Sequence, residues 1–225
     1  MRISSSIKKD AEMKFIFSMI LGILVFFYSF TAYAGIEELE KNLAGTNKAK
    51  AHELQYLPSY CKCKSAENIT PEYRKKCGAH WGKVFSKYPH GKDAMHLHHY
   101  CYALTYLHRY RMGLGDPSSL FKAAEANLNY VITRSHPKFI LMPEFLYKMG
   151  TTQQLMGKND KALQYFYKSI KVSTKYVPAY IEIIKYYQSI SDVGNAIKVT
   201  RKGLEYSPNS VPLKKKLAEL QSLKK

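Results

Sequence analysis

The sequence predicts an all-α protein built from antiparallel helix pairs that stack on one another. The first observation is a fixed spacing: Ala162 and Ala196 lie 34 residues apart, and so do Leu146 and Tyr180. The second is that each unit of this period holds two helical patterns separated by a short polar break. Because neither helix could bury its apolar stripe alone, neighbouring units must pack together. A period of this size is typical of repeat architectures.

Small and bulky residues recur at fixed positions of the two units. These are Leu146, Gly150, Gly157, Ala162, Phe166 and Ser169 in the first unit and Tyr180, Tyr187, Ala196, Gly203 and Pro208 in the second. In this pattern the segment resembles the tetratricopeptide repeat (TPR), a helix–turn–helix unit. The second unit departs from the family pattern at Ile184, where a small residue is preferred, and at Thr200, where an aromatic is preferred. The resemblance implies a short TPR-like solenoid with two units in residues 143–209.

The residue types at these positions suit tight helix packing. Gly150 and Ala162 are small where helix backbones must approach closely, and Phe166 is large where a gap must be filled. Residues 157–160, Gly-Lys-Asn-Asp, predict a turn followed by a helix N-cap.

The N-terminus has the parts of a secretory signal peptide. Lys14 precedes an uncharged apolar run, Phe15 to Phe30, and Ala32-Tyr33-Ala34 follows it. The run is shorter than the roughly 20 residues that a spanning helix needs. We therefore expect residues 1–34 to be a signal peptide cleaved before Gly35, and the protein to be exported, in the periplasm. The alternative is a chain anchored to the membrane by an uncleaved leader, which would be its only membrane contact.

The chain is strongly basic, with a net charge of +18, and the leader contributes only a small part of it. Such a charge keeps a protein soluble and attracts anions. An exported chain rarely meets nucleic acid, so acidic polysaccharide or lipid head groups are the better anionic partners. The competing interpretation is that lysines only coat the solvated helix faces.

Residues 35–57 predict two short helices that pack as a lid on the first repeat. Leu54 and Leu57 lie at helical spacing, and Pro58 is expected to end the second helix. Together with the cysteines that follow, this part forms a predicted N-terminal helical segment, 35–91, packed on the repeats.

All four cysteines follow the leader, at Cys61, Cys63, Cys77 and Cys101. In an exported protein they are expected to form disulfides. A Cys61–Cys63 bridge would be strained because it spans one residue, which leaves two pairings. We favour Cys61–Cys101 with Cys63–Cys77, because the first ties the N-terminal segment to a long helix and the second closes a local loop.

A metal site is the competing interpretation of the same segment. Cys77 and His80 have a ligand-like spacing, and Cys61 and Cys63 could supply two thiolates. Residues 93–111 predict one helix, on which His96 and His99 share a face, whereas a third ligand is not visible. We expect these histidines to serve in packing and hydrogen bonding, and we assign no metal and no cofactor. The segment 60–111 is also similar to exported bacterial repeat proteins with no known activity.

Residues 92–142 predict a degenerate first repeat. Asp116 is a good N-cap and Pro117 suits the first helical position. Pro143 is expected near the start of the next helix. Ser210 is expected to cap a terminal helix, 210–225, whose leucine stripe runs from Leu213 to Leu223 and whose lysines suit a polar end of the array.

Catalytic signatures are absent from the sequence. It contains no G-x-S-x-G, H-E-x-x-H, phosphate-binding or dinucleotide-binding motif. We expect a non-enzymatic protein that mediates protein–protein interactions in the cell envelope. A binding module for an anionic envelope polymer is the second hypothesis. A thiol- or metal-dependent enzyme is the third, and it would need Cys101 as a free thiolate beside a histidine.

The TPR resemblance also implies where a protein or peptide partner would bind. In the family the first helices of successive units line a concave groove, and some members clamp a carboxylate there with lysine and asparagine. Tyr147 and Thr151 stand at the clamp positions, so a peptide with apolar anchors is expected instead. The residues implied to contact it are Tyr147, Thr151, Gln154, Ile181, Lys185 and Gln188.

Overall fold

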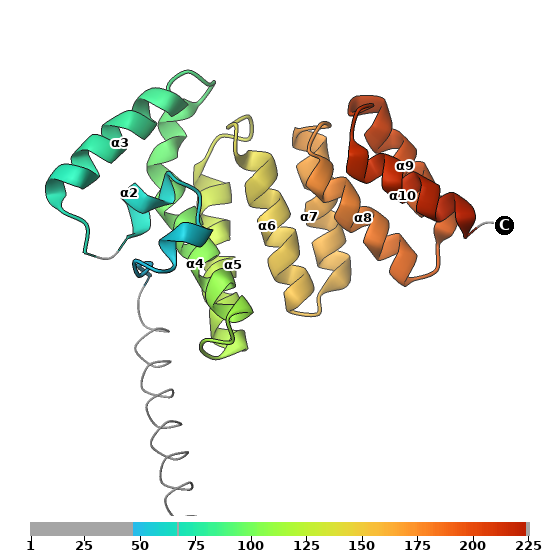
Figure 1. Cartoon of the computed structure of the whole chain (residues 1–225), viewed down its shortest axis with the longest axis horizontal. Helices are drawn as coiled ribbons and strands as arrows, with labels where there is room; N and C mark the ends of the chain where they lie inside the picture. Colours follow the sequence, from blue (N-terminus) through green and yellow to red (C-terminus); the bar gives the residue numbers. More distant parts are fainter. Residues whose placement is uncertain (1–46, 67, 224–225) are drawn as a thin grey trace, which may run out of the picture. The chain divides into compact units, whose positions relative to one another are not determined.

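The computed structural model describes residues 47–66 and 68–223, and within them the chain is all-helical (Figure 1). The all-α prediction is therefore confirmed for this part of the chain. The predicted leader and the first short helix of 35–57 lie outside the described residues. The elements are η1 (Leu54–Tyr56), α2 (Cys61–Ser65), α3 (Pro71–Phe85), η2 (Gly91–His96), α4 (Leu97–Arg111), α5 (Pro117–Arg134), α6 (Met142–Leu155), α7 (Asn159–Val172), α8 (Val177–Ser189), α9 (Val193–Tyr206) and α10 (Val211–Ser222).

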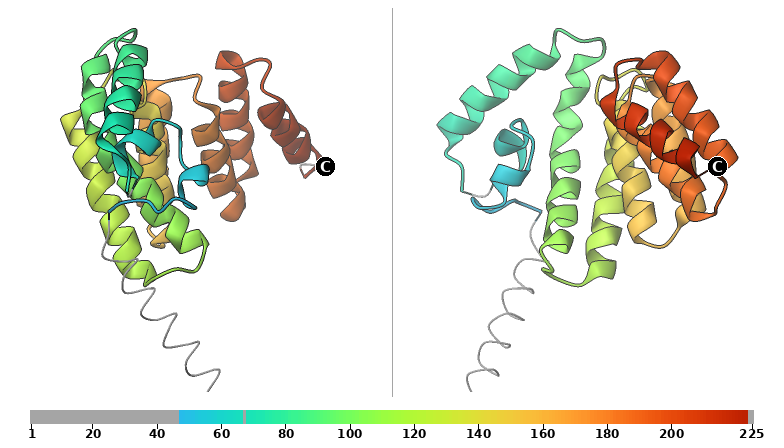
Figure 2. Two further views of the ribbon diagram at one scale, coloured as in Figure 1. Left: turned by 60° about the vertical axis from the view of Figure 1, so that its left-hand side comes forward. Right: turned by 45° about the vertical axis from the view of Figure 1, so that its right-hand side comes forward.

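From α4 onward, helices that follow each other in the chain pack against each other (Figures 1 and 2). Short turns join α4 to α5, α6 to α7 and α8 to α9. The second helix of each pair packs against the first helix of the next pair, α5 against α6 and α7 against α8. Helix α10 covers α9 and part of α8. The C-terminal half is thus assembled from contacts between segments that are close in sequence.

Glycines allow two of these helix contacts to be unusually close. A Cβ at Gly150 would lie 2.5 Å from the Phe166 ring, and a Cβ at Gly203 would lie 2.9 Å from the Leu213 side chain. Ala162 is 2% exposed where α7 faces Gly150. The small and large residues therefore interlock as the sequence predicts.

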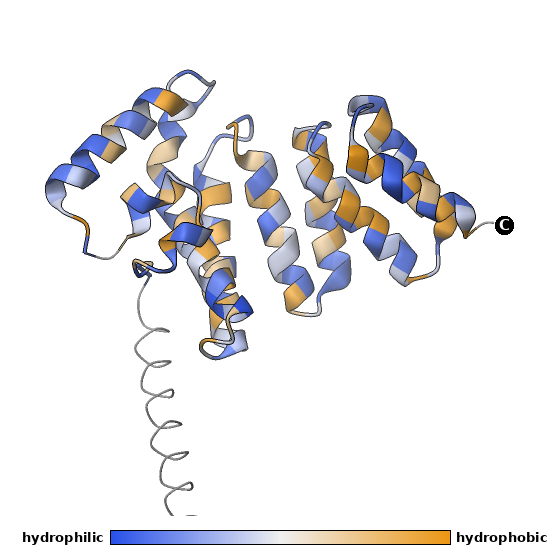
Figure 3. Cartoon of the chain, in the orientation of Figure 1, coloured by the Kyte–Doolittle hydropathy of each residue, from blue (hydrophilic) through white to orange (hydrophobic). Residues whose placement is uncertain are grey.

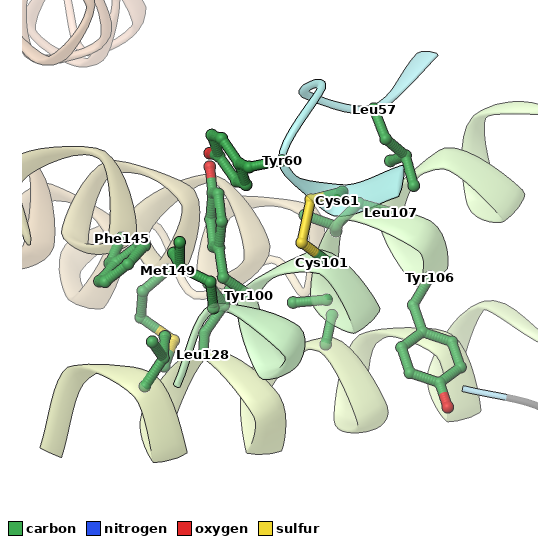
Figure 4. Packing of buried hydrophobic residues seen from close by; sticks show 14 of the residues in the cluster. Leu57, Tyr60, Cys61, Tyr100, Cys101, Tyr106, Leu107, Leu128, Phe145 and Met149 are labelled. Carbon is green, nitrogen blue, oxygen red and sulfur yellow. A yellow bond between two sulfur atoms is a disulfide. The ribbon is translucent and has the colours of Figure 1, made fainter. Parts of the chain in front are cut away.

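The core is continuous in the N-terminal half and forms two smaller clusters in the C-terminal half. The largest cluster includes Tyr100, Leu128 and Phe145, which come from three different helices (Figure 4). The Tyr100 and Phe145 rings lie 4.7 Å apart between centroids. Around Tyr180 a second cluster joins α8, α9 and α10.

Two disulfides fasten the N-terminal elements together. Cys61 is bonded to Cys101, with 5.3 Å between their Cα atoms, and this bond links α2 to α4 (Figure 4). Cys63 is bonded to Cys77, with 5.5 Å between Cα atoms, and this bond links α2 to α3. This is the pairing that the sequence analysis favours. It uses all four cysteines, since none in the chain is free.

Helix α3 buries little of its own surface, and one disulfide, Cys63–Cys77, fastens it to α2. Phe85 is its only buried residue among those described, and most of its length is hydrophilic (Figure 3). It packs against α2 and η2. Thr70 caps its start by accepting a hydrogen bond from the Tyr73 N–H at 3.2 Å, and Pro71 occupies its first turn.

Several predicted helix boundaries are confirmed. The Asp116 carboxylate accepts a hydrogen bond from the Ser119 N–H, and Pro117 begins α5. Pro143 lies in the first turn of α6. Ser210 caps α10, where Leu213 and Leu220 are buried. The predicted stripe is wrong at Leu223, which follows the last residue of α10 and is 62% exposed.

One local prediction is met in part and two are wrong. The second of the two short helices expected in 35–57 is present before Pro58 as a single turn of 3-10 helix, Leu54–Tyr56. The start of the helix predicted at Asp93 is also 3-10, and α4 begins only at Leu97. The predicted side-chain cap of α7 does not form, since Lys158 occupies the cap position without a side-chain hydrogen bond.

Candidate functional site

The six residues predicted to contact a partner form two rows on alternate helices, α6 and α8. Tyr147, Thr151 and Gln154 lie on α6, spaced so that they share one face. The second row, on α8, is Ile181, Lys185 and Gln188. None of the six is buried, and Gln154 and Lys185 are exposed. We call these six residues the α6–α8 face.

Tyr147 is the aromatic centre of the α6–α8 face. Its ring centroid lies 5.8 Å from Phe166 and 5.7 Å from Tyr176, the residue that precedes α8. The Lys148 ammonium lies 5.4 Å from the same ring centroid. Partial burial raises the pKa of the Tyr147 hydroxyl, and the nearby Glu182 carboxylate raises it further. Helix packing thus holds one side of the ring while part of it remains accessible.

The ring contact between Tyr147 and Tyr176, the residue before α8, places Tyr147 near the start of α8. Glu182 and Lys185 both act on the Tyr147 hydroxyl, in opposite directions. They also pair with each other, with 2.8 Å between the Lys185 Nζ and a Glu182 carboxylate oxygen. Since this pair is partly exposed, it contributes only about 0–1 kcal/mol.

Helix α10 extends the polar part of this face. The Gln188 amide donates to Glu219 at 3.3 Å and accepts from Lys216 at 3.4 Å. Lys216 and Glu219 are themselves 2.8 Å apart. A row of amide, ammonium and carboxylate groups therefore continues from α8 onto α10, which the sequence analysis does not predict.

The α4 side of the face is more positive. Burial lowers the pKa of Lys148, and the nearby Arg111 guanidinium lowers it further, while Glu144 opposes them.

Glu144 accepts a hydrogen bond from the Tyr100 hydroxyl at 2.5 Å. Burial is the main reason why the pKa of Tyr100 lies well above its usual value. This tyrosine therefore remains a neutral donor, and its bond fixes Glu144 at the start of α6.

The predicted histidine cluster packs against α5. The His99 ring stacks on Tyr130 with 3.7 Å between centroids, and its Nδ1 lies 2.8 Å from the Asn127 Oδ1. His96 makes an edge contact with the same tyrosine, at 5.9 Å. Within residues 47–66 and 68–223, no three His, Cys, Asp or Glu side chains gather as metal ligands would.

A buried ion pair joins the start of the described chain to α4 and is missed by the sequence analysis. The Arg109 Nε donates to Glu53 Oε1 at 2.8 Å and its Nη2 donates to Glu53 Oε2 at 3.0 Å. A further bond from Nη2 reaches the Lys48 carbonyl at 2.9 Å. Arg109 follows Cys101 and Thr105 at helical spacing, so its inward position is readable from the stripe. Its partner, Glu53, lies 56 residues away in the sequence, and no local pattern predicts that the two residues pair.

A hollow of about 890 Å³ lies among α7, α8 and α9, away from the predicted face. The hydroxyls of Tyr167 and Tyr187 meet at 3.1 Å beside it. Lys198, Arg201 and Lys202 also line it. Each of these three residues is exposed, so the hollow is open to solvent and carries excess positive charge.

Comparison with known proteins identifies no family: no family model matches the chain, and no curated protein is significantly similar to it. Within the described residues, none of the helices combines the length and the apolar character that crossing a membrane requires.

Proposed function

We propose that this chain is an exported, non-enzymatic protein of the TPR type that binds a protein partner on the α6–α8 face. The observation that carries the proposal is the alignment of two rows on alternate helices around one partly accessible tyrosine. Aromatic side chains with an anchored ring and an open edge are common centres of binding energy. The amides of Gln154 and Gln188 flank this centre and can orient a peptide backbone.

The packing of the repeat positions supports the TPR-like arrangement. Ala162 and Ala196 are 2% and 0% exposed, so equivalent positions of the two units are equally buried. Gly150 and Gly203 both stand where another side chain approaches too closely for a Cβ. In this arrangement α6 and α8 are the first helices of successive units and line the concave side.

The two disulfides support export. Disulfides persist in oxidising compartments and are rare in the cytosol. With every cysteine of the chain bonded, no thiol is left for nucleophilic catalysis. The proposal therefore places the protein in the periplasm, after removal of residues 1–34.

The partner that suits this face is an extended or helical peptide with an apolar anchor and polar flanks. The anchor would pack on Tyr147 and Ile181, while Lys185 and Gln188 would pair with carboxylate or carbonyl oxygens of the peptide. A terminal carboxylate clamp is a poorer fit, because Tyr147 and Thr151 occupy the positions where basic and amide side chains would be needed.

The test places a photo-crosslinking amino acid at Gln154 and, in a second variant, at Gln188. Both positions should trap the same protein in the envelope of the producing cell, and position 168 on α7 should not. With that partner purified, Tyr147→Ala should weaken binding by about 2 kcal/mol or more while the helical content stays the same.

Tyr206→Ala is the matched control, because Tyr206 is a partly exposed tyrosine on α9 outside the face. Its affinity for the partner should equal that of the wild type. If Tyr147→Ala loses thermal stability but keeps its affinity, Tyr147 is only a packing residue and the proposed face is wrong.

A second candidate function, binding of an anionic envelope polymer, is favoured by the hollow that Lys198, Arg201 and Lys202 line. Retention on an immobilised acidic polysaccharide should then fall steeply with salt, because screening weakens exposed charge pairs. Exchange of these three residues for glutamine should abolish the retention. Retention that survives the triple exchange would exclude this hollow as the polymer site.

A further inference from the structure

Two neighbouring hollows lie between α3 and the α4 side of the molecule, on elements that the proposed partner face does not use. One has a volume of about 310 Å³ and the other about 290 Å³. Lys64 and Gly78 line both, so the two hollows adjoin at these residues. Figure 2 shows α3 standing apart from α4, with α2 beside them. We call the two hollows together the α3 groove.

The larger hollow of the α3 groove is mainly apolar. Trp81 and Phe85 line it from α3, and Met95 and Leu97 line it from the opposite side. Gly78 and Gly82, one turn apart on α3, leave its wall open: a Cβ added at either would meet no atom within 4 Å. The space above these glycines is therefore available to a ligand.

The smaller hollow is basic. Lys64, Arg74 and His98 line it together with the Tyr102 side chain. No aspartate or glutamate of residues 47–66 or 68–223 lines either hollow. Burial lowers the pKa of Lys64. Burial is also the main reason why the pKa of His98 is lowered, and the charges of Lys64 and of two neighbouring histidines lower it further. Three cationic or titratable groups thus face one space without a lining counter-charge.

The disulfides crosslink the elements that line this groove. Helix α2 supplies Lys64 and is bonded to both walls, to α3 through Cys63–Cys77 and to α4 through Cys61–Cys101. Cys77 directly precedes Gly78, so one crosslink fixes the place where the two hollows adjoin. A site whose walls are fixed in advance loses less entropy when a ligand binds.

We propose that the α3 groove binds a small amphipathic anion, with a carboxylate or phosphate in the basic hollow and an apolar body in the other. An apolar hollow of this volume is at the small end of ligand pockets and suits a chain of roughly ten carbons. The anion receives charge-assisted hydrogen bonds from Lys64 and Arg74, and the apolar body lies along Gly78 and Gly82 beneath Trp81. A free fatty acid and a lipid acyl chain share this chemistry.

Trp81 gives a direct readout, because it is the only tryptophan in the chain and lines the apolar hollow. Decanoate and decyl phosphate, titrated into the oxidised protein at low salt, should change the Trp81 emission in a saturable way. Acetate should not, and decanol should bind about tenfold more weakly than decanoate, since it lacks the charge. A Trp81 response to anionic lipid vesicles alone would contradict a free small-molecule ligand.

Two variants separate the parts of the site. Lys64→Gln/Arg74→Gln should raise the Kd for decanoate about tenfold or more and leave that for decanol unchanged. Its matched control is Lys75→Gln/Lys83→Gln, which removes the same charge from exposed positions of α3 and should behave as the wild type. An equal loss of affinity in both double variants would overturn the proposal.

Gly78→Leu should fill the place where the hollows adjoin and abolish the response to decanoate and decanol alike. The substitution removes a helical glycine, so it should not weaken α3. Circular dichroism checks that the helical content is preserved. A wild-type Kd in this folded variant, or no saturable response of the wild type to decanoate or decyl phosphate, would show that the groove is not a ligand site.

Discussion

The N-terminal region, residues 47–111, and the C-terminal helices α6–α10 are stabilised in different ways. The first is tied by two disulfides and by an ion pair that spans 56 residues. The second is held by packing between successive helices, with glycines where backbones approach closely. The Cys61–Cys101 bond lies within the largest core cluster and adds to its packing, whereas the Cys63–Cys77 bond fastens α3, which buries little apolar surface of its own.

This difference has a functional consequence. A region whose walls are crosslinked can keep a cavity open, because the links replace the contacts that would otherwise close it. The α3 groove lies in that region. The C-terminal helices carry no disulfide, and their hollow of about 890 Å³ among α7, α8 and α9 is open to solvent.

The largest expected loss follows from breaking the buried ion pair. Arg109→Met leaves the Glu53 carboxylate buried without its guanidinium, and both side chains are at most 1% exposed. We expect the free energy of unfolding to fall by about 3–5 kcal/mol. Arg201→Met, at an exposed site on α9, should change it by less than about 0.5 kcal/mol. Urea denaturation of both variants measures the difference, and equal effects would contradict the role given to the ion pair.

Removal of the Cys61–Cys101 disulfide should have a similar or slightly smaller effect. The bond closes a loop of 40 residues, which corresponds to about 4 kcal/mol in the chain-entropy model. Cys63→Ser/Cys77→Ser opens a loop of 14 residues and should cost about 3 kcal/mol. The second variant should also free α3 selectively, seen as faster amide exchange in residues 71–85. Unchanged exchange there would show that α3 is held by its own packing.

Replacement of a glycine by alanine should have opposite effects on stability in the two regions. Gly150→Ala forces a Cβ toward the Phe166 ring and should destabilise the protein by about 1–3 kcal/mol. Gly78→Ala meets no atom within 4 Å, so the better helix propensity of alanine should stabilise it by up to about 1 kcal/mol. Thermal denaturation compares the two, and a stabilising Gly150→Ala would contradict close packing of α6 on α7.

The smallest expected effect is a pH dependence of the N-terminal region. His108 stacks on Tyr56 at 4.5 Å. Burial lowers its pKa, and Arg111, His52 and Arg109 act in the same direction, while Glu53 opposes them. The unfolded chain therefore binds the proton first.

Stability contributed by neutral His108 should be present above about pH 6.5 and lost as the pH falls below it. The free energy of unfolding of the wild type, measured between pH 7.5 and 5.5, should decline more than that of His108→Gln. Parallel profiles would rule out His108 as the titrating group. Glu53 adds a further loss of stability at lower pH, because its pKa is lowered in the folded protein. Burial alone would raise this pKa, but the hydrogen bonds from Arg109 and Lys50 outweigh the effect of burial.

The sequence predicts the helices best where contacts are local. The spacing from Leu146 to Gly203 is enough to place α6 to α9, since each apolar stripe is covered by the next helix in the chain. The sequence does not predict the ion pair between Glu53 and Arg109, because the two residues are 56 positions apart and meet only in the folded chain. The α3 groove is also hidden, because it depends on how far α3 stands from α4. Gly78 and Gly82 are its only local sign.

The central claim, that the disulfides fasten α2 and α3 while packing alone holds the C-terminal helices, is tested most directly by amide hydrogen exchange before and after reduction of both disulfides. Reduction should sharply lower protection in α2 and α3 and partly in α4, while α6 to α9 keep theirs. Equal loss of protection across α2 to α9 would contradict the claim, because it would mean that the two regions unfold as one unit.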